Sequence, residues 1–199
     1  MSQDGVNEDR RRFLIGATSV VGAVGAVGVA IPFVKSWKPS AKAKAAGAPV
    51  EVNVGKLEEG QQVIAEWRGK PVFIVRRDQS MIDRLAADNP RLRDPDSTNT
   101  DQQPEYAQNR LRSLREDIVV LIGLCTHLGC SPKYYPEVVP HSFDEQWSGG
   151  YYCPCHGSRY DLAGRVYKGV PAPSNLVVPP HSFKDDNVII VGVDEEVVG

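Results

Sequence analysis

The chain lacks an excess of positive charge, is poor in cysteine and has only one long uncharged run. Its 199 residues carry 23 Lys and Arg against 25 Asp and Glu, a formal net charge of -2. A protein that binds a phosphate backbone needs clustered basic residues, so the composition argues against nucleic acid as a partner. The four cysteines form no C-x-x-C-H sequence, which excludes c-type haem attachment.

The one long uncharged run covers residues 13–34. As an α-helix it would be about 33 Å long at ~1.5 Å per residue, which matches a hydrocarbon core of ~30 Å. We therefore predict a single transmembrane anchor. A cleaved signal peptide is the alternative, because small residues follow at 41–48, but the run exceeds the ~7–15 apolar residues of an ordinary signal core.

The segments on either side of this run predict export and a tether. Residues 10–14 read R-R-R-F-L, and we interpret residues 1–12 as a cytoplasmic twin-arginine export segment. Positive charges flank both ends of the run, so charge alone does not set its orientation. Residues 35–49 offer few groups able to pack, which predicts a flexible tether. On sequence alone, a passive spacer is the simpler interpretation of that stretch.

The remaining residues, 50–199, are one domain's worth of chain, and their patterns predict antiparallel β structure. A short helix is expected from residue 82 to 87, ended by Asn89-Pro90, and the polar residues 93–109 read as a surface excursion. The fold class is therefore all-β (antiparallel) with one N-terminal helix. Runs of strand composition lie at residues 50–54, 62–67, 70–75, 118–124, 159–167 and 187–193, with turns expected at Gly164 and at Asp185-Asp186.

All four cysteines and two of the four histidines lie in two boxes, C-T-H-L-G-C at 125–130 and C-P-C-H-G-S at 153–158. Thiolate and imidazole are ligands of soft or borderline metals, so a metal centre is the first hypothesis. Each box offers one cysteine and one histidine and leaves one cysteine over, which can bridge. The candidate ligands are Cys125, His127, Cys153 and His156, and the spare residues are Cys130 and Cys155.

The spacing of these ligands discriminates between kinds of metal site. A structural zinc site pairs its ligands as C-x2-4-C, which the boxes match only at the edge. The plant-type ferredoxin spacing C-x4-C-x2-C lacks its third cysteine here, and an all-cysteine cluster would leave both histidines unexplained. What remains is a two-iron cluster with two thiolates on one iron and two imidazoles on the other.

The paired boxes resemble the signature of Rieske iron–sulfur proteins, and this version resembles the membrane-anchored subunit of bacterial ubiquinol–cytochrome c reductases. The resemblance implies a Rieske-type 2Fe-2S cluster and a cluster-binding subdomain at about residues 118–175. It implies that Cys125 and Cys153 hold one iron, that His127 and His156 hold the other, and that Cys130 and Cys155 form a disulfide. Because cytosolic thiols are kept reduced, such a disulfide places the domain in the periplasm.

The resemblance also implies roles around the cluster. Ser158 and Tyr160 stand where the family has hydroxyl donors, toward a bridging sulfide and the sulfur of Cys125, and such bonds favour the reduced state. Leu128 and residues 169–173 are expected to shield the cluster, although Val170 intervenes where the family commonly has proline directly after the glycine. His141 and His181 lie outside the boxes, and we interpret both as surface loop residues.

By resemblance, the chain takes one electron from ubiquinol at a cytochrome b site, with a proton accepted at a cluster histidine, and passes the electron to cytochrome c1. Electron and proton uptake are coupled at His127 and His156, and His156 is the expected quinol contact. The setting is a dimeric complex in the bacterial inner membrane, since one span cannot form a quinone pocket alone. The alternatives are the Rieske small subunit of an arsenite oxidase and a structural zinc module; a cytosolic ferredoxin component conflicts with the anchor.

Overall fold

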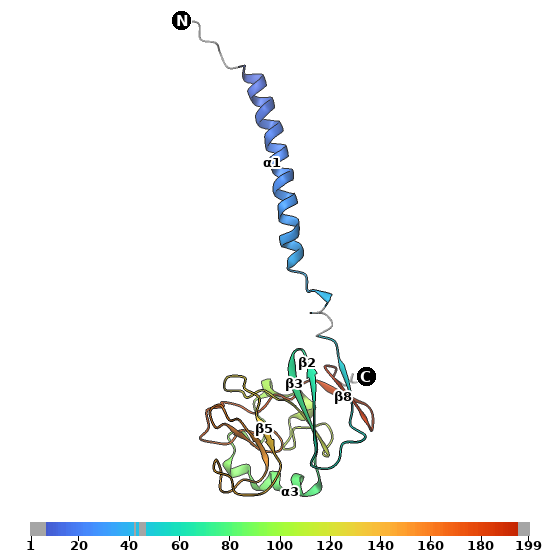
Figure 1. Ribbon diagram of the computed structural model, residues 1–199, viewed down its shortest axis with the longest axis vertical. Helices are drawn as coiled ribbons and strands as arrows, with labels where there is room; N and C mark the ends of the chain where they lie inside the picture. The colour runs from blue at the N-terminus through green and yellow to red at the C-terminus, as the bar shows by residue number, and fades with distance from the viewer. Residues whose placement is uncertain (1–6, 42, 44–46, 195–199) are drawn as a thin grey trace. The chain divides into compact units, whose positions relative to one another are not determined.

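The computed structural model describes residues 7–41, 43 and 47–194, and the chain divides into two units, Met1–Ala45 and Ala46–Gly199. The first unit holds helix α1 (Glu8–Ser36), whose start is capped by Asn7 through a 3.0 Å hydrogen bond from the Arg10 backbone N–H. Among the described residues, α1 alone is long and apolar enough to cross a membrane (Figure 1).

Helix α1 contains the whole predicted anchor, residues 13–34, and none of its side chains is buried within the protein. Exposed side chains such as Phe13 and Val21 would be covered by lipid in a membrane. The helix extends beyond the uncharged run at both ends, so it also takes in the arginines at 10–12. Residues 1–6 of the predicted export segment and residues 42 and 44–46 of the predicted tether lie outside the described residues.

The second unit is built from three antiparallel three-stranded sheets, as the sequence predicts (Figure 1). The first sheet has the order β1-β9-β8, the second β2-β3-β4 and the third β5-β6-β7. The strands are β1 (Val50–Asn53), β2 (Gln62–Trp67), β3 (Lys70–Arg76), β4 (Ile118–Ile122), β5 (Lys133–Tyr135), β6 (Gly150–Tyr152), β7 (Arg159–Tyr160), β8 (His181–Asp185) and β9 (Val188–Val191).

The second sheet lies between the other two, and its strands β3 and β4 are buried on both faces, whereas the edge strand β2 is partly exposed. Side chains alternate along a strand, so Ile74 of β3 joins a core with Ile189 of the first sheet. Its neighbour Phe73 joins a second core with Tyr151 of the third sheet, and the two rings stack with centroids 5.7 Å apart. Burial of both faces explains why β3 and β4 are unbroken apolar runs rather than alternating ones.

Between β3 and β4 the chain forms a helical insertion. Helix α3 (Gln79–Ala87) begins where the Asp78 carboxylate accepts a 2.8 Å hydrogen bond from the Met81 N–H, three residues earlier than the apolar pattern predicts. It buries Leu85 against Leu162 of the third-sheet region. Three short 3-10 helices follow: η1 (Asn89–Arg91), η2 (Thr100–Gln102) and η3 (Glu105–Ala107).

Two interpretations of polar segments are wrong. Residues 93–109 are not simply a surface excursion, because Ser97 and Ala107 are fully buried and the Gln103 amide donates to the Ser97 carbonyl at 2.9 Å. His181 is not a surface loop residue: it is the first residue of β8, wholly buried, with its ring edge-on to Tyr106. Buried polar side chains that bind backbone groups produce no hydrophobic periodicity, so the sequence does not predict their burial.

Candidate metal centre

The first box forms a six-residue loop at the end of β4. The Cys125 N–H donates to the Cys130 carbonyl at 2.7 Å, and the Gly129 N–H donates to the Cys125 carbonyl at 2.9 Å. These two bonds close the loop on itself. Gly129 has φ +81°, a left-handed conformation that glycine adopts without steric cost.

The second box forms a loop with the same backbone bonds after β6. The Cys153 N–H donates to the Ser158 carbonyl at 2.8 Å, and the Gly157 N–H donates to the Cys153 carbonyl at 3.0 Å. Gly157 has φ +77°, which matches its counterpart in the first loop. The two boxes are therefore the same structural unit used twice, each presented from the end of a β-strand.

A disulfide joins Cys130, the last residue of the first loop, to Cys155, the third residue of the second. This confirms the pairing that the family resemblance implies. The sulfur atoms of Cys130, Cys155 and Cys153 lie within 4.8 Å of one another, a grouping that by itself would suggest three thiolate ligands. Two of the three are bonded to each other, so Cys153 is the one that remains available to a metal.

Cys125 and Cys153 are the two free thiols, and both are buried. Burial alone raises the pKa of a thiol. For Cys125, hydrogen bonds from the Tyr160 hydroxyl and the His127 backbone N–H outweigh burial, and the pKa falls below its ordinary value. For Cys153, burial and the neighbouring Cys125 raise the pKa. A thiol that is already biased toward thiolate is a ready metal ligand.

The two box histidines lie against each other. The ring centroids of His127 and His156 are 4.8 Å apart, with the ring planes at 88°. Within the part of the chain that the structure describes, the buried Nδ1 of His127 has no hydrogen-bond partner. The His156 side chain is exposed. Two buried thiols beside two adjacent imidazoles, one with an orphaned ring nitrogen, fit the donor set of a mixed thiolate–imidazole iron–sulfur cluster.

Tyr160 is buried and donates its hydroxyl to the Cys125 sulfur at 3.2 Å, as the resemblance implies. Its oxygen also accepts the Thr126 N–H at 3.1 Å. Burial, with the hydrogen bond to Cys125, raises the pKa of Tyr160 far above its ordinary value. The phenol therefore keeps its proton, and remains a donor, well into the alkaline range. Thr126 was missed at the level of sequence, because a threonine beside a ligand has no distinguishing spacing.

Ser158 is also buried, and its oxygen accepts the Ala172 N–H at 3.1 Å. The serine's own proton is thus free to point elsewhere, and Ser158 is among the groups that lower the pKa of Cys125. Of the shielding residues, Val170 is buried in the core around Tyr160, so the residue that departs from the family's commoner pattern fills space there. Leu128 is 71% exposed, so it is an apolar surface group next to His127 in the loop of candidate ligands.

Fold and site together define a small antiparallel β domain that carries a thiolate–imidazole centre between two matched loops. Residues 48–180 match the family model described as "Rieske [2Fe-2S] domain", and residues 1–40 match "Ubiquitinol-cytochrome C reductase Fe-S subunit TAT signal". The chain therefore belongs to the family of Rieske iron–sulfur subunits of ubiquinol–cytochrome c reductases.

Relatives support the assignment along the whole chain. The "Ubiquinol-cytochrome c reductase iron-sulfur subunit" of Allochromatium vinosum is 54% identical over 98% of this chain and 93% of its own length. The protein of the same name from Blastochloris viridis is 44% identical over 96% of this chain and 97% of its own. A chain of the solved structure titled "Hyperthermophilic respiratory Complex III" is 28% identical, covers 87% of this chain and 96% of its own, and has a TM-score of 0.47.

Membership of this family settles the broad predictions. The cofactor is a Rieske [2Fe-2S] cluster, and the chain is the membrane-anchored electron-transfer subunit of an oxidoreductase complex. The arsenite oxidase subunit and the zinc module, which the boxes alone left open, are not favoured by these matches.

Proposed function

We propose that this chain carries electrons one at a time from ubiquinol, bound at a cytochrome b site, to cytochrome c1 within a dimeric complex. The observation that carries the proposal is the arrangement of the two loops, which gathers two buried free thiols and two adjacent imidazoles and leaves one imidazole, that of His156, exposed. The names of the relatives, which include a mitochondrial "Cytochrome b-c1 complex subunit Rieske", support cytochromes b and c1 as partners.

In this proposal Cys125 and Cys153 hold one iron, and His127 and His156 hold the other. When bound, the cluster supplies a one-electron acceptor, and its two neutral imidazole ligands raise the potential to roughly -150 to +300 mV. The orphaned Nδ1 of His127 supports its assignment as a ligand atom. The thiols are enclosed by protein, which excludes water from the sulfur side of the site.

His156 is the residue that meets the quinol. Its exposed ring accepts a hydrogen bond from the quinol hydroxyl and takes the proton at the nitrogen that faces solvent. Leu128 occupies the corresponding place in the other loop and is also exposed. Together they present one polar and one apolar contact, which suits a quinol headgroup at the edge of an apolar partner surface.

Tyr160 and Ser158 position the thiolate ligands and raise the midpoint potential of the cluster. Each donates a hydrogen bond toward cluster-side sulfur, and such a bond stabilises the more negative, reduced state. At ~1 to 2 kcal/mol per bond and ~59 mV per tenfold change for one electron, each donor raises the midpoint by about 40 to 90 mV.

Export to the periplasm follows from two features. The match of residues 1–40 to a TAT signal supports translocation of the folded domain across the inner membrane. The Cys130–Cys155 disulfide supports an oxidising compartment. Labelling of a cysteine added to an exposed turn, such as Arg68→Cys, by a membrane-impermeant maleimide in intact spheroplasts tests the orientation, and protection until lysis would contradict it.

A potentiometric EPR titration of the membrane-extracted protein at pH 7 and at pH 9 tests the proposal. We expect a reduced two-iron signal with a positive midpoint at pH 7 that falls by pH 9, because electron and proton uptake are coupled at the histidines. Tyr160 keeps its proton across this range, so the fall reports the histidines. A colourless protein with stoichiometric zinc, or a midpoint that does not move with pH, would overturn the proposal.

A further inference from the structure

Directly after Tyr160 the chain folds into a tight hairpin that returns at Val166. The Asp161 N–H donates to the Arg165 carbonyl at 3.0 Å, and Tyr160 pairs with Val166 across the hairpin. Gly164 makes the turn with φ +73°. We call residues 160–166 the tyrosine hairpin, because its first residue carries the hydroxyl that bonds the Cys125 sulfur.

An ion pair with no solvent exposure lies inside the tyrosine hairpin. Arg165 donates from Nε and Nη2 to one carboxylate oxygen of Asp161, both at 2.7 Å. The other carboxylate oxygen accepts the N–H groups of Ala163 at 2.9 Å and of Arg165 at 2.8 Å. Both side chains are 0% exposed. Two ions are costly to bury unless every donor and acceptor is used, and here the carboxylate has four donors.

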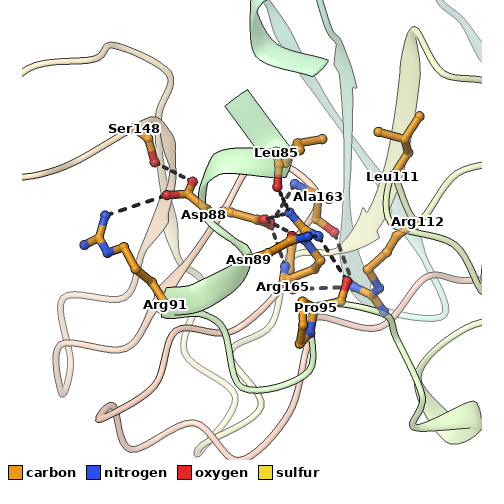
Figure 2. Close-up of polar contacts among 12 residues, drawn as sticks. Leu85, Asp88, Asn89, Arg91, Pro95, Leu111, Arg112, Ser148, Ala163 and Arg165 are labelled. Atoms are coloured by element: carbon orange, nitrogen blue, oxygen red, sulfur yellow. Dashed lines mark hydrogen bonds and ion pairs between the residues drawn. The ribbon is translucent and has the colours of Figure 1, made fainter. Parts of the chain in front are cut away.

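Arg165 also fastens the hairpin to the helical insertion. Figure 2 shows its guanidinium between Leu85, Asn89 and Pro95, and it donates to the Leu85 carbonyl at 2.6 Å, to the Asn89 side-chain oxygen at 2.9 Å and to the Pro95 carbonyl at 3.0 Å. One side chain therefore connects the hairpin to three points on a segment some 70 to 80 residues earlier in the chain.

A second buried arginine, Arg112, binds the turn of the hairpin and the chain at Leu176. Arg112 donates to the Leu176 carbonyl at 2.7 Å and to the Gly164 carbonyl at 3.4 Å. It also donates to the Ala163 carbonyl at 3.3 Å (Figure 2). Its other terminal nitrogen donates to the Gln103 side-chain oxygen at 3.0 Å. The turn of the tyrosine hairpin is thus held by two guanidinium groups.

The hydroxyl at the head of this hairpin has two competing acceptors. Tyr160 Oη lies 3.2 Å from the Cys125 sulfur and 3.2 Å from the Thr126 hydroxyl oxygen. The Thr126 hydroxyl donates its own proton to the Ser174 carbonyl at 2.7 Å, so its oxygen can accept. With two acceptors equally distant, a small displacement of Tyr160 decides which one receives its proton, since hydrogen bonds weaken steeply with angle and distance.

We propose that the buried Asp161–Arg165 pair, supported by Arg112, positions Tyr160 so that its hydroxyl donates to the Cys125 sulfur, and that the pair thereby sets the midpoint potential of the cluster. The inference rests on the proposed role of Tyr160 as a donor to a ligand sulfur. Asp161 and Arg165 act through Tyr160 and are positioning residues.

A double-mutant cycle tests this positioning in the full-length, membrane-extracted protein. Arg165→Lys keeps a charge but loses the paired Nε and Nη2 contacts to one Asp161 oxygen and most of the carbonyl contacts. We expect Arg165→Lys to lower the midpoint in the wild-type background, in the same direction as Tyr160→Phe but by less, and to leave it unchanged in the Tyr160→Phe background. Asp161→Asn keeps the shape of the carboxylate, and we expect it to lower the midpoint in the wild-type background and to leave it unchanged in the Tyr160→Phe background. It replaces Arg165→Lys in the cycle if that variant does not fold.

Arg77→Lys is the matched control. Arg77 is as buried as the hairpin arginines and donates to the Leu111 and Glu116 carbonyls and to Ser113, but it bonds no residue of the tyrosine hairpin. The Arg77→Lys variant is expected to have a lower melting temperature and an unchanged midpoint potential.

The outcomes separate the two proposals. Equal shifts of the midpoint by Arg165→Lys in both backgrounds would show an effect that does not act through the Tyr160 hydroxyl and would overturn the positioning role alone. An unchanged midpoint in Arg165→Lys or Asp161→Asn protein that folds and binds its cluster would also overturn it. An unchanged midpoint in Tyr160→Phe itself would instead remove the donor role on which the inference rests.

Discussion

The two loops that carry the candidate ligands have one backbone and different side chains. At the third position the first loop has His127 and the second has Cys155; at the fourth they have Leu128 and His156. One loop therefore places its histidine one residue nearer the strand, where the ring is half-buried, and the other places it at the exposed tip. The same loop backbone thus gives two unequal histidines, and the exposed one, His156, is the one proposed to meet the quinol.

Exchange of the fourth position should break this asymmetry most strongly. We expect His156→Leu, which gives the second loop the residue of the first, to abolish the cluster, because one iron loses a ligand. Leu128→Ala should leave the cluster in place and weaken only the quinol reaction. Iron content and the reduced EPR signal measure the first effect, and steady-state quinol oxidation in the assembled complex measures the second.

His141→Gln provides the control for that exchange, since His141 stacks on Phe143 outside both boxes. It should keep the full iron content. An intact two-iron signal in His156→Leu would disprove the ligand assignment, whatever the activity.

The sixth position also differs, because Cys130 forms the disulfide while the second loop has Ser158, whose oxygen accepts the Ala172 N–H. Replacement of both bridging residues, Cys130→Ser with Cys155→Ser, should cost about 3 to 4 kcal/mol of unfolding free energy, from the entropy of a chain closed over a 25-residue separation. The double change avoids an odd thiol beside Cys153. Denaturant unfolding measures the loss, and a cost below about 0.5 kcal/mol would mean that backbone bonds alone hold the loops together.

The sequence predicts the loops better than it predicts what supports them. The metal centre could be predicted from the two boxes because cysteine and histidine at such spacing have few explanations other than metal binding. Strands β3 and β4 of the second sheet could be predicted because both of their faces are buried, which leaves continuous apolar runs in the sequence. Arg165 and Arg112 were missed because arginine usually marks the surface, and only the folded chain brings distant carbonyls around each guanidinium.

His181 was missed for a related reason. A histidine between prolines and polar residues has no pattern that indicates burial, yet it starts β8 inside the domain with its Nδ1 2.9 Å from the Pro179 carbonyl. Residues 159–167, predicted as strand with a turn at Gly164, form β7 and the bridged residues Val166 and Tyr167 on either side of that turn. The Asp161–Arg165 pair that closes this turn has helical spacing in sequence, and nothing in the composition reveals its burial.

The hydroxyl donors should give a smaller effect than loss of the disulfide. Tyr160→Phe and Ser158→Ala should each lower the midpoint by about 40 to 90 mV, the equivalent of ~1 to 2 kcal/mol per lost bond, without changing the fall between pH 7 and pH 9. Tyr134→Phe, which loses a bond to the Gly60 carbonyl, should leave the midpoint in place. If Tyr160→Phe also removed the pH dependence, the coupled proton would not reside on the histidines.

The smallest expected effect tests whether the backbones of the two loops are equally rigid. Gly129 and Gly157 have φ +81° and +77°, and a Cβ added to either would meet no atom within 4 Å. Gly129→Ala and Gly157→Ala should therefore each cost only the left-handed strain of about 1 to 2 kcal/mol, with equal losses of unfolding free energy. Unequal losses would mean that one loop is held more rigidly than the other. Cys130 lies one residue after Gly129, and Cys155 lies two residues before Gly157. Repeating both glycine substitutions in the Cys130→Ser, Cys155→Ser background would then decide whether the disulfide causes the difference.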